Sequence, residues 1–205
     1  PGDDADVEEQ LAPLPAPAED LHRQILAGRY DAPDATARLL AETGHPNTYT
    51  FTKCLAEHLL AGRRGEVPLV LLRPSILAAS WREPFPGWID SPAAFALFCV
   101  AVGAGRMRAV VARPRARLDL VPVDVAASRV VDAAFDGASR APSAAPPAIR
   151  HAVAGFPRSP TLRLCGERVG AFFERTPLDG APAARVRYLG LDGRRYRRLH
   201  RRHHQ

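Results

Sequence analysis

A tyrosine and a lysine four residues apart, Tyr49 and Lys53, are the side chains in this sequence with the clearest capacity for chemistry. On a helix this spacing places both on one face, one turn apart. A phenol with its ordinary pKa of about 10 exchanges protons poorly at neutral pH, and an ammonium one turn away stabilises its phenolate form. Such a pair can donate a proton to a carbonyl oxygen while hydride reaches the carbonyl carbon. Lys53 is the only lysine among 28 lysine and arginine residues, and arginine cannot replace a compact, tunable ammonium.

The segments around this pair are typical of alternating helices and strands. Asn47 is placed to cap a helix that runs to Arg64, and the apolar residues 67–72 have the length and composition of a buried parallel strand. Helix followed by buried strand is the order of a βαβ fold. We therefore predict an α/β class, with the chain forming the C-terminal half of a Rossmann-like, doubly wound parallel sheet and a small substrate-side subdomain. The other expected helices are 21–28, 34–44 with Asp34 as cap, 92–102, 124–135 with Asp124 as cap and 160–174 with Ser159 as cap; the other expected strands are 107–112, 118–123 and 151–154.

Composition and charge exclude several classes of protein. The chain is 46% hydrophobic and 24% charged, and no apolar run approaches the roughly 18 residues of a membrane span. The net charge of +6 is concentrated in residues 194–205, which hold six arginines and no acid. We therefore expect a folded domain over residues 1–175, a disordered basic tail over 176–205, and no specific nucleic-acid partner. The three cysteines form no Cys-x-x-Cys pair, which argues against a metal site or a disulfide scaffold and favours a cytoplasmic location.

Four strings that occur in order along the chain carry a family resemblance. They are Pro-Asn-Thr-Tyr-Thr-Phe-Thr-Lys (46–53), Arg-Pro-Ser-Ile (73–76), Glu-Pro-Phe-Pro-Gly-Trp-Ile-Asp (83–90) and Val-Pro-Val-Asp-Val (121–125). Together they resemble the fatty acyl-CoA reductases, which are extended members of the short-chain dehydrogenase/reductase superfamily. The resemblance covers about residues 40–175, and the string at 83–90 is highly specific.

The resemblance implies NADPH-dependent reduction of a long-chain fatty acyl thioester, carried by coenzyme A or acyl carrier protein, to an aldehyde and often onward to the alcohol. Tyr49 would be the proton donor, and Lys53 would be its charge partner and a ligand of the cofactor ribose. The residues expected beside the nicotinamide, at the carboxyl end of their strand, are Arg73, Pro74, Ser75 and Ile76. The residues expected in the wall of the acyl channel are Trp81, Phe85, Pro86 and Trp88, although the three aromatic side chains among them could equally pack their loop onto the core.

The sequence also departs from the family pattern. It contains no glycine-rich turn for a dinucleotide, and no serine precedes Ser75, so we expect a fragment that lacks the N-terminal cofactor-binding half. Two related alternatives are a carrier-protein thioester reductase and a sugar-nucleotide epimerase-like enzyme, and residues 83–90 argue against both. A third is a non-catalytic remnant or binding module that uses its basic tail for a polyanion.

The missing glycine-rich turn generates the first prediction. We expect the isolated 205-residue chain not to bind NADPH and to be poorly soluble, because the strand at 67–72 would expose an edge and an apolar face. Fluorescence titration with NADPH checks the first point, and tight binding would contradict it.

Overall fold

The computed structural model of the chain describes residues 8–92, 94–138, 146–178 and 186–190. The chain divides into two compact units, one formed by Pro1–Arg73 and Val131–His151 and the other by Pro74–Val130 and Ala152–Gln205. Among the described residues the strands pair two by two, β1 with β5, β2 with β4 and β3 with β6. Two of these pairs are parallel, so the fold is of mixed α/β class, as predicted.

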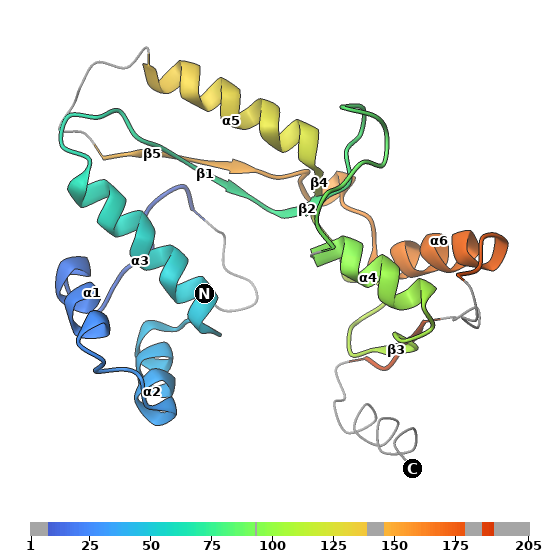
Figure 1. Cartoon of the computed structure of the whole chain (residues 1–205), viewed down its shortest axis with the longest axis horizontal. Helices are drawn as coiled ribbons and strands as arrows, with labels where there is room; N and C mark the ends of the chain where they lie inside the picture. The colour runs from blue at the N-terminus through green and yellow to red at the C-terminus, as the bar shows by residue number, and fades with distance from the viewer. Residues whose placement is uncertain (1–7, 93, 139–145, 179–185, 191–205) are drawn as a thin grey trace. The chain divides into compact units, whose positions relative to one another are not determined.

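In the first unit, three helices pack around one apolar cluster. Leu21 and Leu39 come from the first two helices, and Phe51 and Leu55, one turn apart, come from the third. All four are almost fully buried, which makes this cluster the core that holds the helix of Tyr49 in place. The elements of this unit are α1 (Ala18–Leu26), α2 (Pro33–Thr43), α3 (Thr48–Arg63), β1 (Val70–Pro74) and β5 (Ala148–Ala152), as Figure 1 shows.

The helix ends of this unit follow local sequence signals, with one exception. The Asn47 side chain accepts a hydrogen bond from the Thr50 amide at 2.9 Å, and Gly44 ends α2 in the left-handed conformation at φ 68°, both as predicted. The prediction that Asp34 caps α2 is wrong. Proline at the first helical position starts the helix at Pro33, so Asp34 lies in the first turn and pairs with Arg38 at 3.0 Å.

The strand predicted at residues 67–72 exists but is displaced by three residues. The Val67 amide donates to the Arg64 carbonyl at 3.0 Å, so Val67 belongs to the turn after α3, and Pro68 has no amide hydrogen to pair. The strand β1 therefore begins at Val70, and Leu71 is its one residue classed as buried. It pairs with β5, which lies three residues earlier than the predicted strand at 151–154.

The second unit is built from short parallel strand pairs and two packed helices. In one pair Ile76 aligns with Leu120, and in the other Ala109 aligns with Arg187. The strand at 187–188 was not indicated by the sequence, because a strand of two residues is too short to show an alternation of apolar and polar side chains. Helix α5 begins in this unit and ends in the first one. The elements are β2 (Ile76–Ala78), α4 (Ala94–Gly103), β3 (Ala109–Val110), β4 (Leu120–Pro122), α5 (Val123–Ala138), the 3-10 turn η1 (Phe156–Arg158), α6 (Leu162–Arg175) and β6 (Arg187–Tyr188).

Helix α6 does not begin where the sequence suggested. The cap is Thr161, whose side-chain oxygen accepts from the Leu164 amide at 3.2 Å, and the prediction of Ser159 is wrong. Residues 159–161 are drawn into extended pairing with 116–118, since the Leu118 amide donates to the Pro160 carbonyl at 2.9 Å. The basic segment at 194–205 lies wholly outside the described residues, so the division of the chain at residue 175 stays a prediction.

A glycine permits the close contact between α4 and α6. A Cβ built at Gly103 would lie 2.4 Å from the ring of Phe173, which is far inside van der Waals contact. We expect Gly103→Ala to destabilise the protein by about 1–3 kcal/mol, because the ring must leave its position.

The matched control is Gly62→Ala in helix α3, where no atom lies within 4 Å of the added methyl. That substitution should stabilise the protein by about 0.5–1 kcal/mol through helix propensity alone. Urea unfolding followed by circular dichroism measures both changes, and equal effects of the two substitutions would contradict the packing argument.

Candidate functional site

Tyr49 and Lys53 lie on the solvent face of α3, opposite its buried residues. The Tyr49 side chain is 69% exposed, and the Lys53 ammonium nitrogen lies 5.9 Å from the centre of the Tyr49 ring. Among the described residues Lys53 forms no ion pair, so no carboxylate there accepts a hydrogen bond from its ammonium group. The structure therefore brings the two predicted catalytic side chains together and leaves both open to a ligand.

Arg73 fixes this helix to the end of strand β1. Its Nε and Nη2 donate to the two carboxylate oxygens of Glu57 at 2.8 and 2.5 Å, and the guanidinium also donates to the carbonyls of Glu8 and Gln10. The hydrogen bond with Glu57 raises the pKa of the Arg73 guanidinium. The guanidinium of Arg73 thus donates to Glu57, and the position of Arg73 beside a cofactor stays a prediction.

This ion pair ties the helix that carries Tyr49 and Lys53 to β1. Glu57 lies near the middle of α3, and Arg73 is the fourth of the five residues of β1, so the pair joins the helix to the carboxyl-terminal part of the strand. At 1.5 Å per residue, Tyr49 lies about 12 Å from Glu57 along the helix axis, in the first turn of α3.

In the second unit, the aromatic segment 81–90 is held by a carboxylate. Asp124 accepts backbone hydrogen bonds from Trp81 at 2.9 Å, Arg82 at 2.8 Å and Glu83 at 3.2 Å. The amide of Trp81 is the largest cause that lowers the pKa of Asp124 to about 2. The prediction that Asp124 caps a helix is wrong, because α5 begins one residue earlier and the carboxylate binds this loop.

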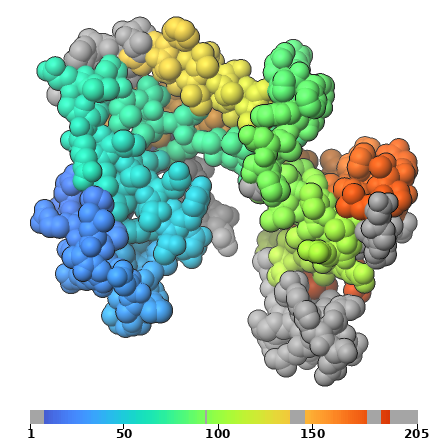
Figure 2. Space-filling view, in the orientation of Figure 1, coloured from blue at the N-terminus to red at the C-terminus, as the bar shows by residue number. Residues whose placement is uncertain are grey.

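Ser80 closes the same loop from its other side. Its hydroxyl donates to the Phe85 carbonyl at 2.6 Å and accepts from the Trp88 amide at 3.1 Å. The side chains of Trp81 and Phe85 nevertheless remain 65% and 58% exposed. Figure 2 shows this segment, in green, at the surface of its unit. The loop thus has a defined conformation that presents aromatic side chains outward instead of packing them all onto a core.

A second carboxylate, Asp119, was missed by sequence reasoning. It accepts from the Ser75 hydroxyl at 2.6 Å and from the amides of Ala154 and Gly155, both at 2.9 Å. Burial tends to raise the pKa of Asp119, but these hydrogen bonds outweigh it and hold the pKa below its ordinary value. The hydroxyl of Ser75 is therefore used to hold the turn at 154–159. Of the neighbouring residues, Pro74 ends β1 and Ile76 begins β2, aligned with Leu120.

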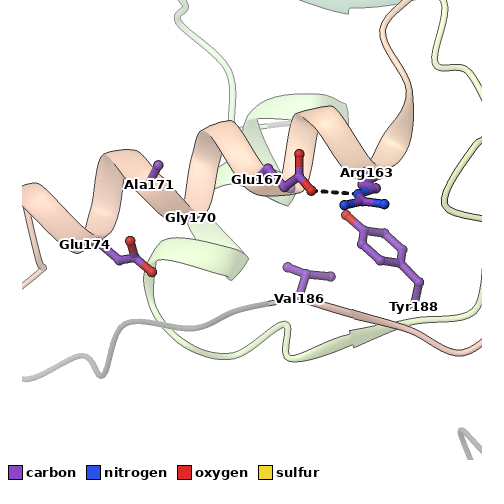
Figure 3. Close-up of a pocket in the computed structure, with 8 residues that line it drawn as sticks. Arg163, Glu167, Gly170, Ala171, Glu174, Val186 and Tyr188 are labelled. Carbon is purple, nitrogen blue, oxygen red and sulfur yellow. Dashed lines mark hydrogen bonds and ion pairs between the residues drawn. The ribbon is translucent and has the colours of Figure 1, made fainter.

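A separate hollow of about 440 Å³ lies between α6 and β6. Tyr188 can lie against the helix because Gly166 has no side chain, and its hydroxyl donates to the Leu162 carbonyl at 3.0 Å. At the same end Arg163 pairs with Glu167 at 2.7 Å, as Figure 3 shows. None of the side chains predicted from the sequence to act on a substrate or cofactor lines this hollow.

Other kinds of site are not formed by the described part of the chain. No group of three or more His, Cys, Asp or Glu side chains there is arranged to hold a metal ion, and no helix there is long and apolar enough to cross a membrane. Cys54, next to Lys53 in sequence, points into the core, and burial raises its pKa, so it behaves as a packed thiol rather than a nucleophile.

Comparison with known proteins connects these features to one family. An NAD-binding family model described as "Male sterility protein" matches residues 4–130, which is more than half of the chain. The chain is 35% identical over 135 residues to "Probable fatty acyl-CoA reductase 4" of Arabidopsis thaliana, covering 66% of this chain and 27% of that protein. It is 41% identical over 108 residues to "Fatty acyl-CoA reductase 1" of Xenopus laevis, covering 52% and 21%. It is 32% identical over 148 residues to "Fatty acyl-CoA reductase 2" of Mus musculus, covering 72% and 28%. The chain thus matches about a quarter of the length of these relatives.

The role of Asp124 can be tested because both tryptophans of the chain, Trp81 and Trp88, lie in the loop that it holds. Its lowered pKa means that the carboxylate stabilises the loop above the ordinary pKa of 3.8 and loses this effect as pH falls through about 2. Tryptophan emission should stay constant from neutral pH to about pH 4 and change below it.

At neutral pH, Asp124→Asn should increase quenching of that emission by acrylamide, since an amide offers one acceptor oxygen in place of two. The control Asp132→Asn alters an exposed carboxylate on the same helix and should leave quenching unchanged. Identical quenching in the wild-type protein and Asp124→Asn would show that the carboxylate does not hold the loop.

Proposed function

This chain belongs to the Male sterility protein family of NAD-binding domains, and we propose that it carries the proton donor and the substrate side of an NADPH-dependent fatty acyl thioester reductase. The observation that supports this most directly is that Tyr49 and Lys53 lie next to each other on one face of α3, open to solvent. The family membership and the names of the relatives support a nicotinamide cofactor and an acyl-CoA donor. We further propose that the paired parallel strands belong to a Rossmann-like sheet.

The residues of this site fit the chemistry that such a cofactor brings. When bound, NADPH supplies a hydride to the carbonyl carbon of the thioester. The Tyr49 hydroxyl donates a proton to the carbonyl oxygen, and the ammonium of Lys53 stabilises the phenolate that remains. Because Lys53 is not engaged by an acid among the described residues, it can also donate to a ribose hydroxyl. Release of the thiol then leaves an aldehyde. A second NADPH would supply the second hydride, and Tyr49, once reprotonated, would again donate the proton that gives an alcohol.

The neighbouring segments have proposed roles that follow from their contacts. Residues 73–76 run beside the nicotinamide, with the Arg73 guanidinium positioning α3 through Glu57 rather than contacting the cofactor. The loop at 81–90 lines the acyl chain with the exposed rings of Trp81 and Phe85, which Asp124 and Ser80 hold in place. A carrier-protein donor remains the alternative to coenzyme A.

Substitution of the two catalytic side chains tests the proposal in a protein in which a glycine-rich nucleotide turn precedes this chain. Tyr49→Phe and Lys53→Met should each lower the rate of NADPH oxidation with a long-chain acyl-CoA by roughly 100-fold or more, because the proton donor or its charge partner is lost. The far-ultraviolet circular dichroism should not change, since both residues are exposed.

Tyr30→Phe is the matched control, because it removes the same hydroxyl from a tyrosine that only donates to Gln24. It should leave turnover within about twofold of the wild type. Full turnover in Tyr49→Phe would overturn the enzyme proposal and favour a non-catalytic binding module.

A further inference from the structure

Two segments of the second unit that are paired through their backbones carry several exposed arginines and one exposed aromatic ring. Residues 113–118 and 156–163 are joined by backbone hydrogen bonds, from Leu118 to the Pro160 carbonyl at 2.9 Å and from Leu162 to the Ala116 carbonyl at 2.8 Å. Arg117 and Thr161 form an antiparallel bridge between them. We call the side chains that these segments carry the arginine platform; its members are Arg113, Arg115, Arg117, Phe156 and Arg158.

The centre of the platform is preorganised. The guanidinium of Arg117 lies 4.8 Å from the centre of the Phe156 ring and donates to the Ser159 carbonyl at 2.6 Å. The ring of Phe156 is 75% exposed, although phenylalanine is among the residues most often buried in folded proteins. The turn that carries it is fixed by Asp119, which accepts from the amides of Ala154 and Gly155. The molecule therefore holds an aromatic ring and a cation outward in one defined arrangement.

The charge of the platform is not balanced by nearby acids. Residues 91–118 contain five arginines and no aspartate or glutamate. Arg113, Arg115 and Arg158 are exposed and form no ion pair within the part of the chain that the structure describes. The neighbouring Arg163 is paired with Glu167. Asp119 keeps its negative charge, but its carboxylate binds the Ser75 hydroxyl and two backbone amides, and among the described residues it forms no ion pair with an arginine. The platform thus presents several unpaired guanidinium groups to solvent.

Guanidinium groups bind phosphate oxygens through paired hydrogen bonds, and the flat faces of arginine and phenylalanine stack on nucleobases. We propose that the arginine platform binds the phosphorylated adenosine of the acyl donor, so that the 3′-phosphoadenosine diphosphate end of an acyl-CoA rests on Phe156 and Arg117 with its phosphates on the flanking arginines. This inference rests on the proposed reductase function. NADPH has related chemistry, but a glycine-rich turn is expected to take its phosphates, so the platform is assigned to coenzyme A.

Calorimetric titration of the full chain with coenzyme A, 3′-dephospho-coenzyme A, NADPH and inorganic phosphate tests the assignment. Coenzyme A should bind most tightly, and removal of its 3′-phosphate should weaken binding about tenfold, as expected for the loss of charge-assisted hydrogen bonds. Inorganic phosphate should bind more weakly than coenzyme A, and NADPH should show no detectable binding. Tighter binding of NADPH, or equal binding of all four, would overturn the assignment to coenzyme A.

Variants locate the binding site. The double substitution Arg115→Gln with Arg158→Gln, and separately Phe156→Ala, should each weaken coenzyme A binding about tenfold or more. The control Arg129→Gln removes an exposed arginine of α5 in the same unit and should have no effect. Unchanged affinity in both platform variants would overturn the proposal.

The two proposals of this chain can fail separately. Tyr49→Phe should abolish turnover without changing coenzyme A affinity, because that tyrosine is not part of the platform. In an active reductase, the double arginine variant should raise the KM for acyl-CoA while leaving kcat/KM for an acyl-pantetheine thioester, which has no nucleotide, unchanged. Equal losses with both donors would overturn the platform proposal and leave the reductase proposal standing.

Discussion

The ion pair between Arg73 and Glu57 is the contact on which the proposed chemistry depends. A surface ion pair contributes little to stability, but here both side chains are less than a quarter exposed, and two parallel hydrogen bonds fix their orientation. Two backbone carbonyls accept from the same guanidinium and so offset part of the cost of removing it from water. The pair joins the carboxyl-terminal part of β1 to the middle of α3, and so fixes to the strand the helix that carries Tyr49 and Lys53.

The second unit uses carboxylates for the same purpose. Asp124 accepts three backbone hydrogen bonds, and Asp119 accepts two, each from a loop more than thirty residues away in sequence. An irregular loop has amides without a secondary-structure partner, and a carboxylate satisfies several of them with one side chain. Such a loop needs no apolar anchor, so its aromatic rings remain available. This explains how Trp81, Phe85 and Phe156 can be both fixed and exposed, a combination that suits binding of a lipid chain or a nucleobase.

The features that could be predicted from the sequence are those that depend on neighbouring residues. The cap at Asn47, the end of α2 at Gly44 and the pairing of Tyr49 with Lys53 all follow from spacings of four residues or fewer. The predictions fail where contacts between segments that are distant in the sequence determine the local structure. Asp34 and Ser159 are good caps by composition, but Pro33 starts one helix early, and pairing of residues 159–161 with 116–118 delays the other. Asp119 gave no local signal, because its partners at 75, 154 and 155 are known only once the chain is folded.

The exposure of Tyr49 places a requirement on the proposed reaction. The Lys53 ammonium nitrogen lies 5.9 Å from the centre of the Tyr49 ring. Two unit charges held about that far apart would interact by about 0.7 kcal/mol in water and by about 3 kcal/mol at an effective dielectric constant of about 20. The ammonium of Lys53 therefore stabilises a phenolate only weakly while both side chains face solvent. Ligands that cover α3 and exclude water would increase this stabilisation severalfold, and they would do so only when the carbonyl group to be protonated is already present. The low burial of the pair is thus compatible with catalysis, provided that the acyl chain and the cofactor complete the walls of the site that the protein leaves open.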